Sequence, residues 1–278
     1  MRSPNAQLAV EEFDKLLKQS NWTAQDAWKG IAVLLLTCEI WRNSAWQPFH
    51  GTVVYREAND FPDVGSGRSN EVLTRSQRLT NYLASRLGGS PAELCSLVGA
   101  YWRQPQIRDL QPHNLVGHAF RSLTVHILQR FGDPGIGYEE EVDAGALFPG
   151  AQLHTRSKRP KIDIVAKRGG LLVALLSVRW RFRHDRVDVV DEAQSYVPAA
   201  IRQNRNCKFY AVLGECSPSR LEKVLFNTYS QQFPNAAIWG TVHFHPEMIT
   251  DSESLAENGR LKGLQSLAWL IGETSNWR

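Results

Sequence analysis

The feature that most constrains the fold of this chain is a short stretch in which nearly every residue is apolar. Residues 171–178, with the sequence LLVALLSV, contain a single polar side chain, that of Ser177. A strand of this composition is typically buried on both faces, so other elements have to cover it from two sides. It follows the strand-like residues 161–167, KIDIVAK, after an Arg-Gly-Gly segment that is typical of a tight turn. The sequence therefore predicts a β-hairpin whose second strand lies inside a sheet.

The period of the apolar residues changes near the middle of the chain. In the first part these residues recur at helical spacing, and the predicted helices cover residues 6–19, 24–42, 69–87, 91–102 and 111–132. In the second part, strand-like segments alternate with helical ones. We therefore expect a mainly helical N-terminal region, residues 1–110, followed by an α/β core, residues 111–278.

The order of elements in the second part predicts its fold class. Strands are expected over 137–145, 161–167, 171–182, 208–214 and 236–244, and helices over 185–203, 217–233 and 258–273. Pro198 should kink or shorten the first of these helices, because proline cannot complete the helical hydrogen bonds. Three successive strands followed by alternating helices and strands favour an α/β fold with a mixed central sheet flanked by helices.

Length and hydropathy narrow the class of protein. The 278 residues suffice for one large domain, or for a core with a smaller lobe. The longest apolar run of the N-terminal half, residues 30–41, is too short to span a bilayer and contains Glu39. The first residues lack the apolar segment of a secretory signal peptide. We expect a cytoplasmic protein with no membrane partner.

The cysteines and histidines give little support for a structural zinc site. No Cys-x-x-Cys pair is present in the sequence. Cys207, Cys216, His243 and His245 could be assembled into a ligand set, and the two histidines alone could bind a metal. Because the two cysteines flank a strand-like run, we interpret them as buried thiols. Phosphate-loop and nucleophile-elbow patterns are also absent from the sequence.

Basic residues gather in two short segments, although the net charge is only +4. Residues 156–168 contain six Lys or Arg and one acid, and residues 179–186 contain four Arg and one acid. A local basic band suggests an anionic partner such as nucleic acid. A solvated charged face would have the same composition, so charge by itself does not decide between the two.

Asp163 is an acid inside an apolar strand. It lies between Ile162 and Ile164, and an acid in this alternation often faces solvent. The hairpin neighbour of this strand, however, is the fully apolar one, so a carboxylate near the end of the sheet should be partly buried. Such a carboxylate requires a cation. A divalent metal and the nearby arginines are both candidates.

Residues 159–194 resemble the active-site hairpin of the PD-(D/E)xK nucleases, and specifically that of type II restriction endonucleases. In that superfamily an Asp on one strand and a Glu-x-Lys or Ser-x-Lys on the next strand build a magnesium site. The matching pieces of this chain are Pro160-Lys161-Ile162-Asp163 and Ser177-Val178-Arg179. The run SVRWRFRHDR also resembles the Ser-x-Lys-Trp-x-x-Arg-x-Asp-Arg pattern of some restriction enzymes. The resemblance implies a restriction-endonuclease-like core in residues 111–278.

The resemblance also implies a ligand set for Mg²⁺. In a subset of these enzymes the second acid is a Glu about a dozen residues further on, on the following helix. Glu192, 13 residues after Arg179, occupies that place, with Asp191 and Asp188 as nearby alternatives. Asp163 and Glu192 would then hold the ion, which suits a cation that prefers oxygen ligands. Glu140, within the run Glu139 to Glu141, is the candidate for a further metal-binding carboxylate.

Arg179 departs from the family pattern, which has a lysine at this position. A lysine amine can lose its proton and help to activate water, whereas a guanidinium practically cannot. Arg179 can still hold the scissile phosphate and stabilise its developing charge. The predicted catalytic set is Asp163, Ser177, Arg179 and Glu192. Either the ion and substrate positioning suffice for cleavage, or the protein binds DNA without cutting it efficiently.

The function implied by the resemblance is that of a type II restriction endonuclease, part of a restriction-modification system. It would cleave double-stranded DNA at a specific short site in a Mg²⁺-dependent reaction. Cleavage of a palindromic site favours a homodimer, with a tetramer as the alternative, and residues 1–110 would contribute to dimerisation and DNA contacts. A repair or transposon-type nuclease on the same core is a second possibility, and a DNA-binding protein with a degenerate nuclease fold is a third.

The predicted DNA contacts come from the basic segments. The candidate DNA-binding residues are Lys161, Arg181, Arg183 and Arg186. The three arginines could contact the DNA backbone or read guanine edges, and they could instead form ion pairs with Asp185 and Asp188.

Overall fold

The computed structural model describes residues 4–36, 82, 84–88, 112–153, 155, 157–180, 188–203, 207–215, 218–226, 239–249 and 259–278. The chain divides into two compact units. The first contains residues 1–22 and 28–119, and the second contains residues 23–27 and 120–278.

The described N-terminal residues are helical. Helix α1 (Pro4–Ser20) is followed by the 3-10 turn η1 (Ala24–Asp26), by α2 (Ala27–Ile31) and by the π-helical turn η2 (Ala32–Leu36). Residues 37–42 of the second predicted helix lie outside the described residues. Of the helix predicted over 69–87, residues 82 and 84–87 are described and are helical. This helix ends at Gly88, whose φ of 75° is favourable only for glycine.

The second unit contains a six-stranded mixed sheet. Its strands are β1 (Ile136–Asp143), β2 (Lys161–Arg168), β3 (Leu171–Arg179), β4 (Lys208–Leu213), β5 (Trp239–His243) and β6 (Leu264–Ser266), in that spatial order. The first three strands are antiparallel to one another, and β3 to β6 are parallel. Helices α9 (Asp188–Arg202) and α10 (Pro218–Leu225) follow β3 and β4 along the chain. The predicted α/β class with a mixed, helix-flanked sheet is confirmed.

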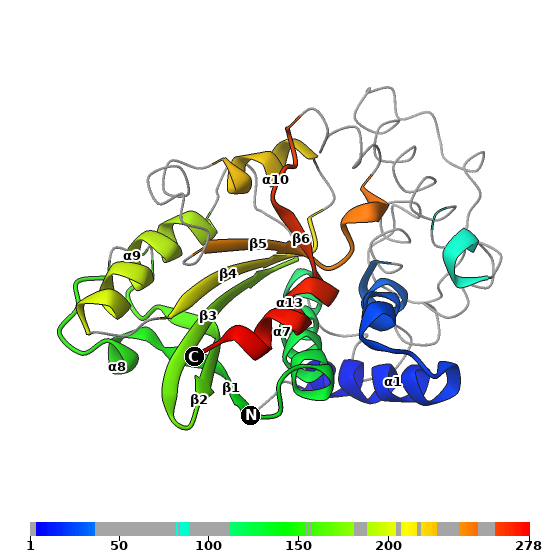
Figure 1. Cartoon of the computed structure of the whole chain (residues 1–278), viewed down its shortest axis with the longest axis horizontal. Helices are drawn as coiled ribbons and strands as arrows, with labels where there is room; N and C mark the ends of the chain where they lie inside the picture. The colour runs from blue at the N-terminus through cyan, green and yellow to red at the C-terminus, as the bar shows by residue number, and fades with distance from the viewer. Residues whose placement is uncertain are drawn as a thin grey trace. The chain divides into compact units, whose positions relative to one another are not determined.

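Helices cover both faces of the sheet (Figure 1). On one face, Val165 and Leu175 share a buried cluster with Val189 of α9 and Leu221 of α10. The other face meets α7 (Pro112–Phe131) and α13 (Leu267–Glu273). There the ring of Phe120, on α7, lies 5.2 Å from that of Trp180 and 6.3 Å from that of Phe244.

The central hairpin forms as the sequence predicts. Gly169 and Gly170 have φ angles of 56° and 83°, which a tight two-residue turn of the right twist requires. Every residue from 172 to 178 is buried, whereas Leu171 at the turn is exposed. Strand β3 is therefore covered on both faces, as its composition predicts.

Some bounds of the predicted helices and strands differ from those of the structure. The helix predicted over 258–273 begins only at Leu267, because Gly259 and Gly263 have φ angles of 77° and 91° that a right-handed helix cannot contain. The intervening residues form a turn and strand β6. Pro198 lies inside α9, which continues to Arg202.

The strand predicted over 137–145 ends at Asp143, two residues earlier than expected. The Asp143 carboxylate accepts a 2.9 Å hydrogen bond from the Ala146 backbone N–H and caps helix α8 (Ala144–Leu147).

Among the described helices, none is long and apolar enough to cross a membrane.

The C-terminal residues pack against strands of the sheet. Trp277 is completely buried, and its indole stacks on the ring of Tyr210 at 5.5 Å and donates a 3.0 Å hydrogen bond to the Tyr210 hydroxyl. Arg168, on β2, donates a 2.8 Å hydrogen bond to the Trp277 carbonyl and another to the Asp133 carboxylate. The end of the chain therefore ties β1, β2 and β4 together.

We predict that Trp277→Ala lowers the free energy of unfolding by about 3–5 kcal/mol, because it removes a large aromatic side chain from the core. Urea denaturation of the purified protein measures this change. Trp269→Ala is the matched control, since that ring is 38% exposed and should cost clearly less. Equal losses for the two variants would contradict the anchoring role of Trp277.

Candidate functional site

The site forms where β2 and β3 separate. Their ladder runs from Arg168 opposite Leu171 to Ile164 opposite Leu176 and ends there. Asp163 is the next residue of β2 and stands opposite Ser177. Its carboxylate accepts a 2.8 Å hydrogen bond from the backbone N–H of Val178. The aspartate side chain thus satisfies a backbone donor that a continued ladder would have paired.

Arg179 joins two carboxylates that come from different elements. Its Nη1 donates to Asp163 Oδ2, on β2, and its Nη2 donates to Glu192 Oε1, on α9. Nη1 also donates to the Val178 carbonyl at 3.0 Å. The exposed fractions of the Asp163, Glu192 and Arg179 side chains are 17%, 16% and 26%. We call these three residues the dicarboxylate site.

Ser177 also binds Glu192. Its hydroxyl donates a 2.5 Å hydrogen bond to Glu192 Oε2. Helix α9 presents Glu192 here because Val189, Ala193 and Tyr196 bury one helical face against the sheet, and Glu192 lies at the edge of that face. The four predicted catalytic residues, Asp163, Ser177, Arg179 and Glu192, are therefore brought together.

A hollow of about 190 Å³ adjoins the dicarboxylate site. Its lining residues are Thr155, Ser157, Pro160, Lys161, Arg179, Asp191, Glu192 and Tyr196. Lys161, a predicted DNA contact, is exposed, as are Lys158 and Arg159 just before it. Asp191 lines the hollow beside Glu192. Arginine and lysine therefore face a space large enough for a small anionic group.

Tyr196 is a site residue that the sequence interpretation missed. It lines the hollow and is almost fully buried. Burial raises the pKa of its hydroxyl above the ordinary value; the Glu192 and Asp163 carboxylates raise it further, and the Arg179 cation opposes them. The phenol therefore stays neutral. Its spacing of four residues from Glu192, within a predicted helix, would have placed both side chains on one face.

The structure does not bring Glu140 to Asp163 and Glu192. Glu140 stands opposite Ile164, the neighbour of Asp163, and successive residues of a strand point to opposite faces. Its carboxylate instead accepts hydrogen bonds from the Ser122 hydroxyl at 2.6 Å and from Arg121 Nε at 3.4 Å. Both donors are on α7, which covers the other face of the sheet.

Glu141 also binds Arg121, whose Nη1 lies 3.1 Å from Glu141 Oε1. The β1–β2 pairing skips Glu141 and Asp163, and the φ of Glu141, 56°, is unusual for a residue other than glycine. Such strain persists only where the surroundings hold it, and it is frequent near functional sites. Arg181, Arg183 and Arg186, the other predicted DNA contacts, lie outside the described residues, and so does the Asp188 side chain.

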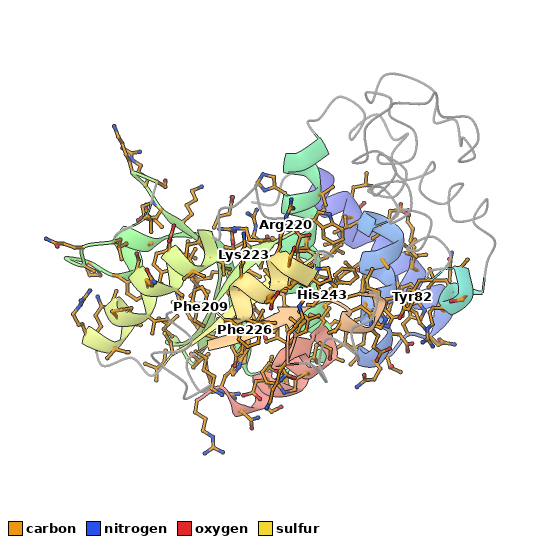
Figure 2. The ribbon with its side chains drawn as sticks, turned by 90° about the horizontal axis from the view of Figure 1, so that it is seen from above. Tyr82, Phe209, Arg220, Lys223, Phe226 and His243 are labelled. Carbon is orange, nitrogen blue, oxygen red and sulfur yellow. The ribbon has the colours of Figure 1, made fainter. Side chains whose placement is uncertain are left out.

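His243 is the last residue of β5 (Figure 2). His243 is completely buried, and its Nδ1 accepts a 3.0 Å hydrogen bond from the His245 backbone N–H. Nearby on α10, Arg220 Nη1 lies 3.2 Å from the buried Glu215 carboxylate. Cys207 is buried, and Cys216 lies outside the described residues. Within the described residues, no group of three or more His, Cys, Asp or Glu side chains is placed to hold a metal ion.

The dicarboxylate site thus combines two partly buried acids, one shared guanidinium and an adjoining hollow with basic and hydroxyl groups. Comparison of the chain with protein-family models, with curated proteins and with solved structures gave no match. Function is therefore inferred from the chemistry of these residues.

We predict a strong energetic coupling between Arg179 and Glu192. In a double-mutant cycle of Arg179→Met and Glu192→Gln, the coupling in unfolding free energy should be about 1–3 kcal/mol, because removing Arg179 leaves two partly buried acids without this cation and removing Glu192 takes away one of the two ion pairs of Arg179. Urea denaturation of the two single variants and the double variant measures it.

The control cycle uses Arg260→Met and Glu222→Gln. This pair is 3.2 Å apart, with side chains 47% and 37% exposed, so its coupling should stay below about 1 kcal/mol. A coupling between Arg179 and Glu192 no larger than that of the control would mean that the dicarboxylate site is not a structural ion-pair network.

We also predict that the free energy of unfolding falls as the pH is lowered, because His243 is buried. Burial lowers the pKa of His243 from 6.5 to about 3. Below pH 6.5 the unfolded chain therefore binds a proton that the folded chain does not, and the free energy of unfolding falls by up to about 1.4 kcal/mol per pH unit as the pH approaches 3. His243→Asn retains an acceptor for the His245 N–H but cannot titrate. Urea denaturation between pH 7 and 4 should show a shallower pH slope for this variant, and identical slopes would contradict the prediction.

Proposed function

We propose that this protein is a Mg²⁺-dependent endonuclease that cleaves double-stranded DNA at a specific short site, as type II restriction endonucleases do. The observation that carries the proposal is the convergence of Asp163, Ser177, Arg179 and Glu192 at one end of the sheet. They come from two hairpin strands and the following helix, which is the arrangement implied by the resemblance to the PD-(D/E)xK nucleases. The strand order of the second unit is compatible with such a core.

The chemistry of the acids fits a magnesium ion. Asp163 and Glu192 offer carboxylate oxygens, which this hard cation prefers, and two carboxylates leave room in its shell for water. Both acids are bound to one guanidinium, so they already lie within reach of a single cation. They would hold the ion, which when bound polarises the phosphate and activates water for hydrolysis. Glu140 is not proposed as a ligand, since it binds Ser122 and Arg121 on the other face.

The remaining residues of the site would position the DNA phosphate. Arg179 lines the hollow and can donate two parallel hydrogen bonds to a phosphate, which would stabilise the charge that develops during hydrolysis. It cannot serve as a general base, because a guanidinium keeps its proton. Ser177 holds Glu192 by its hydroxyl, and the exposed Lys161 would contact the DNA backbone.

The proposal extends to the DNA contacts and the assembly. Arg181, Arg183 and Arg186 follow Arg179 directly in the sequence and would reach the same duplex. Enzymes that cut both strands of a palindrome normally use two sites related by a two-fold axis, so we propose a homodimer, with a tetramer as the alternative.

A DNA-binding protein that does not cleave is the second candidate. The observation in its favour is that Arg179 already pairs with both Asp163 and Glu192, so each acid has a cationic partner without a metal. A lysine in the family position would be able to lose its proton, whereas this arginine keeps its charge. The same basic residues would then bind DNA for recognition alone.

Digestion of a plasmid of known sequence tests the proposal, with Mg²⁺ or with EDTA, for the wild type and for Asp163→Asn. We expect discrete bands with Mg²⁺ that disappear in EDTA, and at least a hundredfold slower cutting by the variant, since the removed charge holds the cation. Mapping the ends of the fragments would give the site.

Glu273→Gln is the matched control. Glu273 has the same exposed fraction as Asp163 and lies 2.7 Å from Lys208, away from the dicarboxylate site, so its loss should leave the bands unchanged. Undiminished cutting by Asp163→Asn would remove the site from the reaction. An intact plasmid that is retarded on a gel, with or without Mg²⁺, would favour the DNA-binding candidate.

A further inference from the structure

The ion pairs of Arg179 place a cation of the protein itself between the two acids that a metal would use. Nη1 of Arg179 donates a hydrogen bond to Asp163, and Nη2 donates one to Glu192. The two carboxylate oxygens that it contacts are therefore not free to bind another cation while the guanidinium remains there. The other two carboxylate oxygens differ in their surroundings, because Glu192 Oε2 accepts the Ser177 hydroxyl.

Electrostatics explains why such a cation is present. Both acids are mostly buried, and two like charges so close together are unfavourable without a positive group. One guanidinium faces two carboxylates, so the formal charge of these three residues sums to −1. A divalent cation would neutralise both acids and make the guanidinium dispensable. The two cations therefore compete for the same oxygens.

We infer that Arg179 is an exchangeable counter-ion, which pairs with Asp163 and Glu192 until a divalent cation binds and is then released to take an anionic group in the adjoining hollow. This regulation of the site rests on the proposed Mg²⁺-dependent function. Arg179 already lines the hollow together with Lys161, so the released guanidinium has a place for a phosphate next to it. Cation binding and phosphate binding would thereby be linked through one side chain.

The inference predicts that removing the guanidinium strengthens cation binding. Binding of Mn²⁺ alone, followed by electron paramagnetic resonance with Mg²⁺ as competitor, measures the affinity without any dependence on catalysis. We expect at least tenfold tighter binding to Arg179→Met than to the wild type, because the ion no longer has to displace a bound group. Arg179→Gln is a second variant that keeps polar donors and should also bind Mn²⁺ more tightly.

Arg260→Met is the control for loss of a positive charge. Arg260 pairs with Glu222, away from the dicarboxylate site, and its removal should leave the Mn²⁺ affinity within twofold of the wild type. Tighter binding by this variant to the same degree as by Arg179→Met would indicate a general charge effect and would overturn the inference.

A measurement on the wild type avoids any dependence on the folding of the variants. The arginine side-chain N–H resonance of Arg179, identified by its loss in Arg179→Lys, should shift and exchange faster with water when Mg²⁺ is added. An unchanged resonance at saturating Mg²⁺ would mean that the guanidinium stays on the carboxylates, and it would overturn the inference.

The outcomes separate this inference from the proposed function. Equal Mn²⁺ affinities of the wild type and both Arg179 variants would overturn the exchange and leave a Mg²⁺-dependent nuclease possible. Absence of Mn²⁺ binding to the wild type and to every variant would overturn the exchange and the proposed Mg²⁺-dependent function together.

Discussion

Burial of β3 on both faces is the constraint on which the rest of the α/β unit depends. Its apolar side chains are removed from water only if helices cover each side, and full burial of an aliphatic side chain contributes about 1.5–3 kcal/mol. Helices α9 and α10 supply one cover, and α7 and α13 supply the other (Figure 1). Strands β2 and β4 satisfy the backbone groups of β3 on its two edges. No polar side chain other than that of Ser177 interrupts the strand before Arg179.

The same constraint decides where charge can appear. Arg179 is the first charged residue after the buried run, at the end of the sheet where β2 separates from β3. A cation at this depth needs anions, and the nearest elements provide Asp163 and Glu192. Packing of α9 against the sheet fixes the position of Glu192, so the ion-pair geometry follows from the burial of apolar residues. A chemically useful cluster is thus a consequence of how the core closes.

Two groups of acids lie on opposite sides of the sheet, and their surroundings differ. Glu140 and Glu141 bind Arg121 of α7 on one side, whereas Asp163 and Glu192 bind Arg179 on the other. The second group adjoins a hollow that is also lined by the exposed Lys161. Location relative to the sheet therefore distinguishes a structural ion pair from a site that can meet a ligand.

The sequence by itself determined the α/β class, the hairpin around Gly169 and Gly170, the burial of β3 and the 13-residue step from Arg179 to Glu192, because composition and period act locally. Tertiary structure alone decided which acids Arg179 binds. The face that Glu140 occupies depends on the register of β1 against β2, and a one-residue shift would reverse it. Strand β6 is too short to show a period, and the helix after it begins only beyond Gly263. Contacts between distant segments exist only once the chain has packed. Tyr196, for example, lines the hollow together with Lys161 and Arg179.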